Sequence, residues 1–400
     1  MRSSKIKVFY TPKQVLKQDA KRNFSKSPMK PKLLLEYLEE KGLIDNFEIV
    51  SGFRPFSNNE FMIAHTKDYV NGFFDGAPIA RSNSLDWSEQ FANSVRYTNA
   101  SLFEAIRNSL VHPEQVSFSP TSGFHHATPT AGRGFCTFSG QVIASVKLYR
   151  TYGSVGAYVD LDGHYGNSIE DARGFAKDLN KAVPVGFNFN PHGYNQQYYN
   201  NLMKFLTRKL QPAILADKID YVVFCHGADS HEADMLHGQC STEFWVKCSK
   251  FFWSWVKDMD ELLGRPLPVS CSLFGGYRQD DYTSVLSLHT TDLVECMRNL
   301  LGLEIDYTTE VTELPKYEPP SWSTPYSQSN NNYYMSRSYI KPNERPYVPS
   351  TDMGVRKQNL NLAEQVMREQ REKEAERDRR NEEEFETFYR IRVQRMEGKG

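Results

Sequence analysis

The sequence lacks a long apolar run, and it lacks an excess of charge of either sign. No uninterrupted apolar stretch approaches the length of a membrane span, and the N-terminal segment MRSSKIKVFYTPKQ has no apolar core of the kind found in signal peptides. The 48 basic and 49 acidic residues leave a formal charge of -1, which offers no electrostatic footprint for nucleic acid or an anionic membrane. These absences favour a cytoplasmic protein, and neither nucleic-acid nor membrane binding is indicated.

Paired cysteines and internal repeats are also missing. No two cysteines form a CxxC pair, and most lie inside apolar runs, which favours a reduced compartment. We expect reduced thiols that act as small hydrophobic residues. The six cysteines are Cys136, Cys225, Cys240, Cys248, Cys271 and Cys296.

Apolar residues are plentiful, at 39% of the 400 residues, which is ample for a buried core. From about residue 10 to residue 307, strand-like and helical apolar segments alternate, and this rhythm predicts an α/β fold with a mainly parallel sheet. We therefore place one large domain at residues 1–307.

The composition changes after this domain. Residues 308–354 are rich in Pro, Ser, Asn and Tyr and poor in aliphatic residues, which predicts a linker or an extended strap. Residues 355–400 are heavily charged and helix-forming, and we expect a solvated helical tail there. Apolar groups on both sides of its charged centre leave oligomer or partner contact as an alternative.

The periodicity of apolar residues predicts the elements of the domain. Strands are expected at residues 5–10, 115–118, 157–161, 183–189, 221–225 and 269–273. Helices are expected at residues 30–40, 89–109, 140–152, 198–210, 241–263 and 281–301.

Two of the expected strands end in acidic residues. Asp160, Asp162 and His164 follow the apolar approach of the strand at 157–161, and Gly163 lets the chain turn so that Asp162 and His164 aim at one point. Asp229 follows the strand at 221–225, where there is no core to fill. Two carboxylates and one imidazole form a three-ligand set with room for water, which is the open arrangement of a catalytic zinc.

Two further stretches carry groups suited to hydrolysis. His125 and His126 follow Gly123 in a loop, where both imidazoles can reach one cavity, and a neutral histidine beside a metal-bound water can take its proton. Asp160 is available to orient a histidine. In SLFGGYRQ, the pair Gly275-Gly276 projects Tyr277, whose phenol is able to donate a hydrogen bond to an oxyanion.

In this order, HH…GFC…DxDxH…GAD…GGY, the motifs resemble the histone deacetylase superfamily, which includes the acetylpolyamine amidohydrolases and shares the arginase-like fold. The segments PMKPKLLLEYLEEKGL and FMIAHTKDYVNGF are similar to two further family segments, so the resemblance covers roughly residues 5–305. It implies a single three-layer α/β domain with helices on both faces of the sheet.

The resemblance also implies roles for individual residues. It makes His126 the general base and His125 an electrostatic partner and candidate acid, held by Asp160. It makes Tyr277 the residue that polarises the scissile carbonyl. The implied zinc ligands are Asp162, His164 and Asp229, and the implied substrate-channel residues are Phe135, Gly275 and Gly276.

This chain departs from the family pattern near the ligands. Tyr165 stands where the family has a histidine, Gly163 replaces a bulkier residue, and Asn167 would orient the second histidine through a neutral amide. The segment from residue 167 to 198 has no clear match to the loop that supplies a second channel aromatic. A structural potassium ion, held by backbone oxygens around Asp160, Asp162 and His164, is implied by the family, but these departures leave it open.

The expected function is therefore zinc-dependent hydrolysis of a linear amide, removing an acetyl or other acyl group from a lysine side chain of a protein or peptide or from a polyamine. The main alternative is a catalytically quiet module that binds an acyl-lysine or acyl-amine and has an interaction tail. A two-metal ureohydrolase is disfavoured, because Tyr165 and Asn167 stand where a DxHxD pattern would place further ligands.

Overall fold

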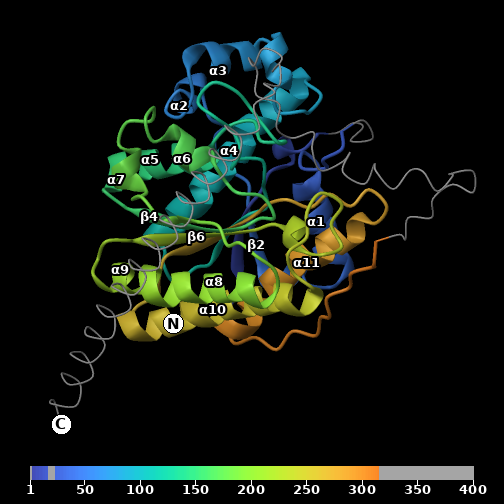
Figure 1. Cartoon of the computed structure of the whole chain (residues 1–400), viewed down its shortest axis with the longest axis vertical. Coiled ribbons are helices and arrows are strands. Elements are labelled where there is room, and N and C mark those ends of the chain that lie inside the picture. The colour runs from blue at the N-terminus through green and yellow to red at the C-terminus, as the bar shows by residue number, and fades with distance from the viewer. Residues whose placement is uncertain (1, 17–22, 315–400) are drawn as a thin grey trace, which may run out of the picture. The chain divides into compact units, whose positions relative to one another are not determined.

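A computed structural model describes residues 2–16 and 23–314, and in this part of the chain seven strands form one sheet (Figure 1). All the pairings are parallel, and the strand order is β2-β1-β3-β7-β6-β4-β5. The strands are β1 (Ile6–Phe9), β2 (Phe47–Val50), β3 (Ser117–Ser119), β4 (Gly156–Leu161), β5 (Asn188–Phe189), β6 (Tyr221–His226) and β7 (Val269–Leu273).

Helices cover both faces of this sheet, which gives three layers (Figure 1). One face packs against α1 (Lys30–Glu40), α8 (Gln196–Lys204), α10 (Thr242–Leu263) and α11 (Tyr282–Glu295). The other face packs against α4 (Glu89–Val111) and α5 (Gly140–Tyr152). The shorter helices are α2 (Asn58–Phe61), α3 (Lys67–Phe74), α6 (Ser168–Ala172), α7 (Leu179–Ala182) and α9 (Gln211–Leu215).

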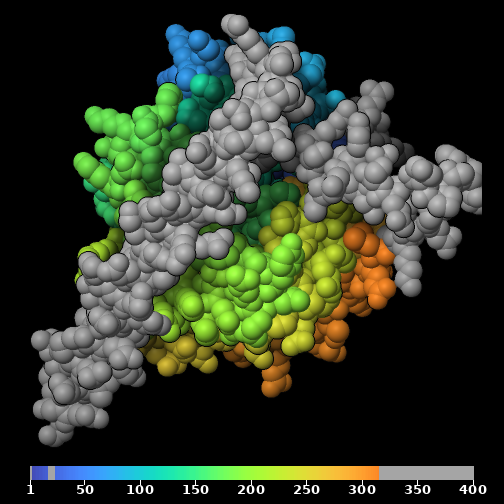
Figure 2. Space-filling model, in the orientation of Figure 1, coloured from blue at the N-terminus to red at the C-terminus, as the bar shows by residue number. Residues whose placement is uncertain are grey.

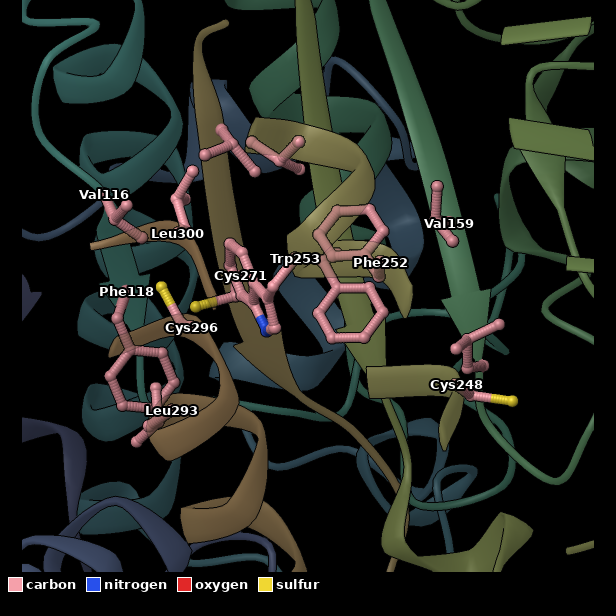
Figure 3. Close-up of a cluster of buried hydrophobic side chains, with 14 of the residues drawn as sticks. Val116, Phe118, Val159, Cys248, Phe252, Trp253, Cys271, Leu293, Cys296 and Leu300 are labelled. Carbon is pink, nitrogen blue, oxygen red and sulfur yellow. The ribbon is translucent and has the colours of Figure 1, made fainter. Parts of the chain in front are cut away.

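Side chains of the inner strands alternate between the two layers. On β6, Val222 and Phe224 belong to the core under α10 and α11, here called the first core. Tyr221, Val223 and Cys225 belong to the core under α4 and α5. Both faces are apolar because a parallel sheet is covered on both sides. Figure 3 shows part of the first core, where helix residues such as Phe252, Trp253 and Cys296 meet strand residues such as Phe118, Val159 and Cys271.

The expected three-layer α/β fold with a parallel sheet is confirmed, and the helices predicted at 30–40 and 140–152 have those bounds. The strand predicted at 183–189 is wrong over most of its length, since β5 is only Asn188–Phe189. Pro184 has no N–H for the ladder and Gly186 has a φ of +84°, so the backbone turns before β5 begins. The sequence pattern did not predict β2, α2, α3, α6, α7 or α9, most of which are too short to show a period.

Residues 303–314 form an extended segment, here called the C-terminal strap. Its side chains alternate between partly buried and exposed, and Leu303, Ile305, Tyr307 and Val311 pack against the first core. The strap is the orange trace and surface in Figures 1 and 2. Residues 315–400, which hold the rest of the expected linker and the whole expected charged tail, lie outside the described residues.

Within the described residues, none of the helices combines the length and the apolar character needed to cross a membrane.

Candidate active site

The candidate site lies at the carboxyl ends of four adjacent strands. In the order β3-β7-β6-β4, each strand is followed by a loop that carries one of the sequence motifs. The carboxyl ends of parallel strands meet at one edge of the sheet, and this edge is where ligands bind in open α/β folds. The sheet order therefore brings together residues that are far apart in sequence.

Asp162, His164 and Asp229 converge on one point. Each offers a ligand atom, and these atoms lie within 4.8 Å of one another. His164 Nδ1 is 2.8 Å from Asp229 Oδ2 and 3.3 Å from Asp162 Oδ1. Both carboxylates are almost completely buried, and His164 is partly buried.

The electrostatics of this group favour a cation. Burial lowers the pKa of His164, but hydrogen bonds to Asp162 and Asp229 outweigh burial and raise the pKa to about 11. The two buried carboxylates require a compensating positive charge, and a bound cation in place of the His164 proton would supply it. The donor set of two carboxylates and one imidazole, with three protein ligands, fits zinc.

Backbone groups and glycines hold the two carboxylates in place. Gly275 N donates to Asp162 Oδ2 at 2.7 Å, and Gly163 N donates to Asp229 Oδ1 at 3.0 Å. A Cβ at Gly275 or at Gly227 would lie 2.2 Å from an Asp229 carboxylate oxygen. Only glycine at these two positions lets the chain approach the carboxylate this closely.

His125 lies between two carboxylates. Its Nδ1 is 3.0 Å from Asp160 Oδ2, and its Nε2 is 3.6 Å from Asp162 Oδ1. Burial lowers the pKa of His125, but the charges of Asp162 and Asp160 outweigh it and raise the pKa to about 9. His125 is therefore an imidazolium at neutral pH.

The pKa of His126 is shifted in the opposite direction. Burial and the charge of His125 lower the pKa of His126 to about 3, so its imidazole is neutral. Its Nδ1 donates to Asn167 Oδ1 at 2.9 Å, and Asn167 Nδ2 donates to Asp171 Oδ2 at 2.5 Å. Because Nδ1 carries the proton, Nε2 is left free to accept one. The sequence pointed to Asn167 but not to Asp171, although a spacing of four residues across the start of α6 could have suggested it.

Tyr277 lies near His164 and Phe135. Its ring centroid is 6.2 Å from that of His164 and 5.4 Å from that of Phe135. Burial and the charge of Asp229 raise the pKa of its phenol well above the ordinary value, so the hydroxyl keeps its proton. Gly276 has a φ of +147°, and a Cβ there would lie 2.6 Å from Val285, so the turn before Tyr277 requires glycine.

Phe135 is held in an uncommon backbone conformation beside Tyr277. Its φ is 61°, in the left-handed region, and its N–H donates to the Asn83 carbonyl at 2.9 Å. Backbone strain of this kind is frequent at functional sites. The side chain of Asn83 is buried and bonds Thr137 Oγ1, so Asn83 supports the turn.

Two residues near this site were not identified from the sequence. Phe24 is 39% exposed, and its ring centroid is 6.2 Å from that of Phe135 and 6.3 Å from that of Tyr277. Lys30 is buried and donates to the Phe274 carbonyl, and burial lowers its pKa to about 8. Lys30 lies within the PMKPK segment that carried the family resemblance, whereas no local pattern identifies Phe24.

The expected potassium site stays a prediction. Among the described residues, Asn188 Oδ1 is a buried oxygen without a hydrogen-bond partner, and it lies on β5 next to β4. A buried oxygen of this kind is suited to a cation or an ordered water.

Comparisons with known proteins show similarity to histone deacetylases. The family model of the histone deacetylase domain matches residues 25–177, which include the histidine pair, Phe135 and the DxDxH motif but neither Asp229 nor Tyr277. The chain is 23% identical over 294 residues to histone deacetylase 14, chloroplastic, of Arabidopsis thaliana, covering 63% of this chain and 66% of that protein. It is 25% identical over 189 residues to histone deacetylase 8 of Danio rerio, covering 44% and 49%.

A probable histone deacetylase 19 of Zea mays is 24% identical over 161 residues, covering 36% of this chain and 31% of that protein. The matched part thus spans less than two thirds of the length of these relatives. The crystal structure of the HDA15 HD domain has the same fold, with a TM-score of 0.56, 15% identity, and coverage of 78% of this chain and 91% of that one. The family model and the relatives show that the chain is similar to histone deacetylases, and the solved structure shows that it shares their fold.

Proposed function

We propose that this protein is a zinc-dependent hydrolase of linear amides that removes an acetyl or other acyl group from an amine such as a lysine side chain. The observation that carries the proposal is the convergence of Asp162, His164 and Asp229 within 4.8 Å. His126 and Tyr277 lie next to this group, with ring centroids 6.0 and 6.2 Å from that of His164.

The charge states of the surrounding residues suit this chemistry. Zinc bound by the three ligands would polarise the amide carbonyl and lower the pKa of a bound water to about 7. Neutral His126, oriented by Asn167, would accept the proton of the attacking water at Nε2. The protonated phenol of Tyr277 would donate to the carbonyl oxygen as it gains negative charge. Protonated His125 would stabilise that charge, and one of the two histidines would return a proton to the leaving amine.

The substrate is proposed only by class. An acyl-lysine in a protein or peptide and an acylated polyamine both present an acyl amide on a flexible aliphatic chain. Phe24 and Phe135 beside Tyr277 offer apolar ring surface to such a chain. The polar atoms of the site act on the amide itself, which both substrates share.

The test is acetate release from an acetyl-lysine peptide library and from acetylated polyamines, with and without a zinc chelator. We expect release that the chelator stops and added zinc restores. Tyr277→Phe should lower kcat by about a hundredfold or more, because it removes one oxyanion donor. Tyr194→Phe is the matched control, since Tyr194 is 68% exposed, and it should behave as wild type.

Two outcomes would contradict the proposal. Peptide binding without acetate release would favour the quiet binding module instead. Wild-type turnover in Tyr277→Phe would remove the role assigned to the phenol.

A further inference from the structure

Arg278, the residue after Tyr277, is buried although it carries a charge. Only 2% of it is exposed. Its guanidinium donates two hydrogen bonds to Asp280, from Nε to Oδ1 at 2.8 Å and from Nη2 to Oδ2 at 2.7 Å. The remaining donors reach the carbonyl of Ala233 at 3.1 Å, the carbonyl of Thr312 at 2.8 Å and the hydroxyl of Thr312 at 3.0 Å. One side chain therefore joins three separate segments.

One of these segments is the C-terminal strap, which runs antiparallel to α11. The Tyr307 hydroxyl bonds the Ser287 carbonyl, and Glu310 N bonds Ser287 Oγ at 2.8 Å. Further along the strap, Thr312 N bonds Ser284 Oγ at 3.0 Å. Later strap residues thus meet earlier helix residues. The strap brings Thr312 back to the start of α11, where the loop that carries Tyr277 ends.

The loop that carries Tyr277 is held by hydrogen bonds to other segments of the chain. Residues 274–281 belong to no helix or strand. Tyr277 N donates to Asp234 Oδ2 at 2.7 Å, and Asp234 lies in the loop after β6, next to Ala233. Arg278 bonds Ala233 and Thr312 at the same time, so it links the support of the Tyr277 backbone to the strap. Arginine suits this task because its planar fork holds several acceptors in a fixed geometry.

We propose that Arg278 is a positioning residue that couples the C-terminal strap to the placement of Tyr277, with Thr312 as its anchor on the strap. The effects on kcat and KM expected for this role rest on the proposed amide hydrolysis. Arg278 itself touches no reacting atom. Its contribution is to keep the phenol where a substrate carbonyl would receive its hydrogen bond.

The first test compares two isosteric changes on the same strap in the full chain. Thr312→Val removes a hydroxyl that accepts from Arg278 at 3.0 Å and donates to Asp281 Oδ2 at 2.7 Å. Thr309→Val removes a hydroxyl that bonds Thr291 at 2.7 Å farther along α11. We expect Thr312→Val to lower kcat about tenfold with KM nearly unchanged, since a misplacement of about 1 Å can cost about a hundredfold. Thr309→Val should leave both constants at wild-type values.

The second test compares two arginines. Arg278→Lys keeps the charge but loses the planar guanidinium and its several donors. Arg298→Lys is the matched control, because Arg298 bonds the same strap at the carbonyls of Ile305 and Tyr307, at 2.9 and 2.7 Å. Arg278→Lys should lower kcat at least as much as Thr312→Val does, and Arg298→Lys should not. If each test variant and its control lost kcat by the same factor, the cause would be general destabilisation and the proposal would be overturned.

A third readout does not need activity. In protein labelled with 3-fluorotyrosine, the ¹⁹F signal of Tyr277 is assigned by its loss in Tyr277→Phe. Arg278→Lys and Thr312→Val should shift or broaden this signal, and the two controls should not. An unchanged signal in both test variants would refute the positioning role. If the wild type hydrolyses no acyl amide but the signal responds as expected, the proposed function fails and the positioning role stands.

Discussion

At the scale of single residues, two adjacent histidines have opposite charge states. The pKa of His125 is raised to about 9 and that of His126 is lowered to about 3, although their ring centroids are only 4.1 Å apart. Burial lowers the pKa of both histidines. The charges of Asp162 and Asp160 outweigh burial at His125, whereas the charge of His125 lowers the pKa of His126 further. One site thereby holds a charged and a neutral imidazole at the same pH.

Asn167→Ala tests how much the orientation of His126 matters. The change removes the acceptor for Nδ1–H and disconnects Asp171, so the imidazole loses its fixed tautomer. We expect kcat to fall about 10- to 100-fold, in the range typical of partners that orient a reacting or ligating histidine. Asn180→Ala, where the side chain only accepts a bond from Arg173 at the surface, should leave kcat unchanged. Equal kcat values in the two variants would show that Asn167 does not orient the base.

Gly275→Ala tests the fit around Asp229. The added Cβ would lie 2.2 Å from the Asp229 carboxylate, so the ligand would have to move. We expect the purified variant to bind much less than one zinc per chain, measured by elemental analysis, whether or not it is active. Gly174→Ala is the control, because a Cβ there meets nothing within 4 Å. Full zinc loading of Gly275→Ala would contradict the close packing described above.

At the scale of elements, a buried carboxylate joins α2 to α5. Glu60 bonds Ser57 N at the start of α2, and it also pairs with Arg54 and with Lys147 of α5. Partial burial raises the pKa of Glu60, but the bonds from Arg54 and Lys147 outweigh it and lower the pKa from 4.5 to about 2. A four-residue helix has little stability of its own, so this network is what fixes α2.

The Glu60 network predicts a pH-dependent contribution to stability. Since the pKa is lower in the folded protein than in the unfolded chain, the stabilisation is complete above about pH 5 and is lost as pH falls from about 4.5 towards 2. The Tm of Glu60→Gln should therefore lie below that of wild type at pH 7, and the gap should narrow towards about pH 3.5 in calorimetry.

The control for this measurement is Glu36→Gln. Glu36 pairs with Lys32 on the surface of α1, where both side chains are about half exposed. Such pairs contribute little, so Tm should hardly change at either pH. A gap for Glu60→Gln that stays constant with pH would argue against ionised Glu60 as the cause.

At the scale of the whole molecule, we expect zinc binding to stabilise the folded domain. Asp162 and Asp229 are almost fully buried at the centre of the sheet edge, and they bring together loops that follow β4, β6 and β7. A ligand that binds only the folded state stabilises it by about 4 kcal/mol at a thousand times its Kd. Zinc binding should therefore stabilise the entire domain and not only its site.

We expect added zinc to raise the Tm of the full chain by several degrees and a chelator to reverse the rise. Asp229→Asn should abolish this response, because it removes one of the three ligands. Asp258→Asn, an exposed change on α10, should keep the response. If neither zinc nor a chelator changes the Tm, these residues do not form a metal centre.

The sequence by itself determined much of the fold and the identity of the candidate site residues. Apolar periodicity located α1, α5 and β7, because long elements with one or two buried faces repeat their pattern over many residues. The charged ends of β4 and β6 were recognisable for the opposite reason: Asp160, Asp162 and Asp229 interrupt apolar strands where no core requires them.

Only the tertiary structure decided which of these groups meet. The order β3-β7-β6-β4 places four loops side by side, and no local period encodes that order. Contacts such as His164 with Asp229, Phe24 with Phe135 and Arg278 with Thr312 join residues from distant segments. Their side chains are oriented by packing and by the strand order of the sheet, and these depend on the whole chain folding at once.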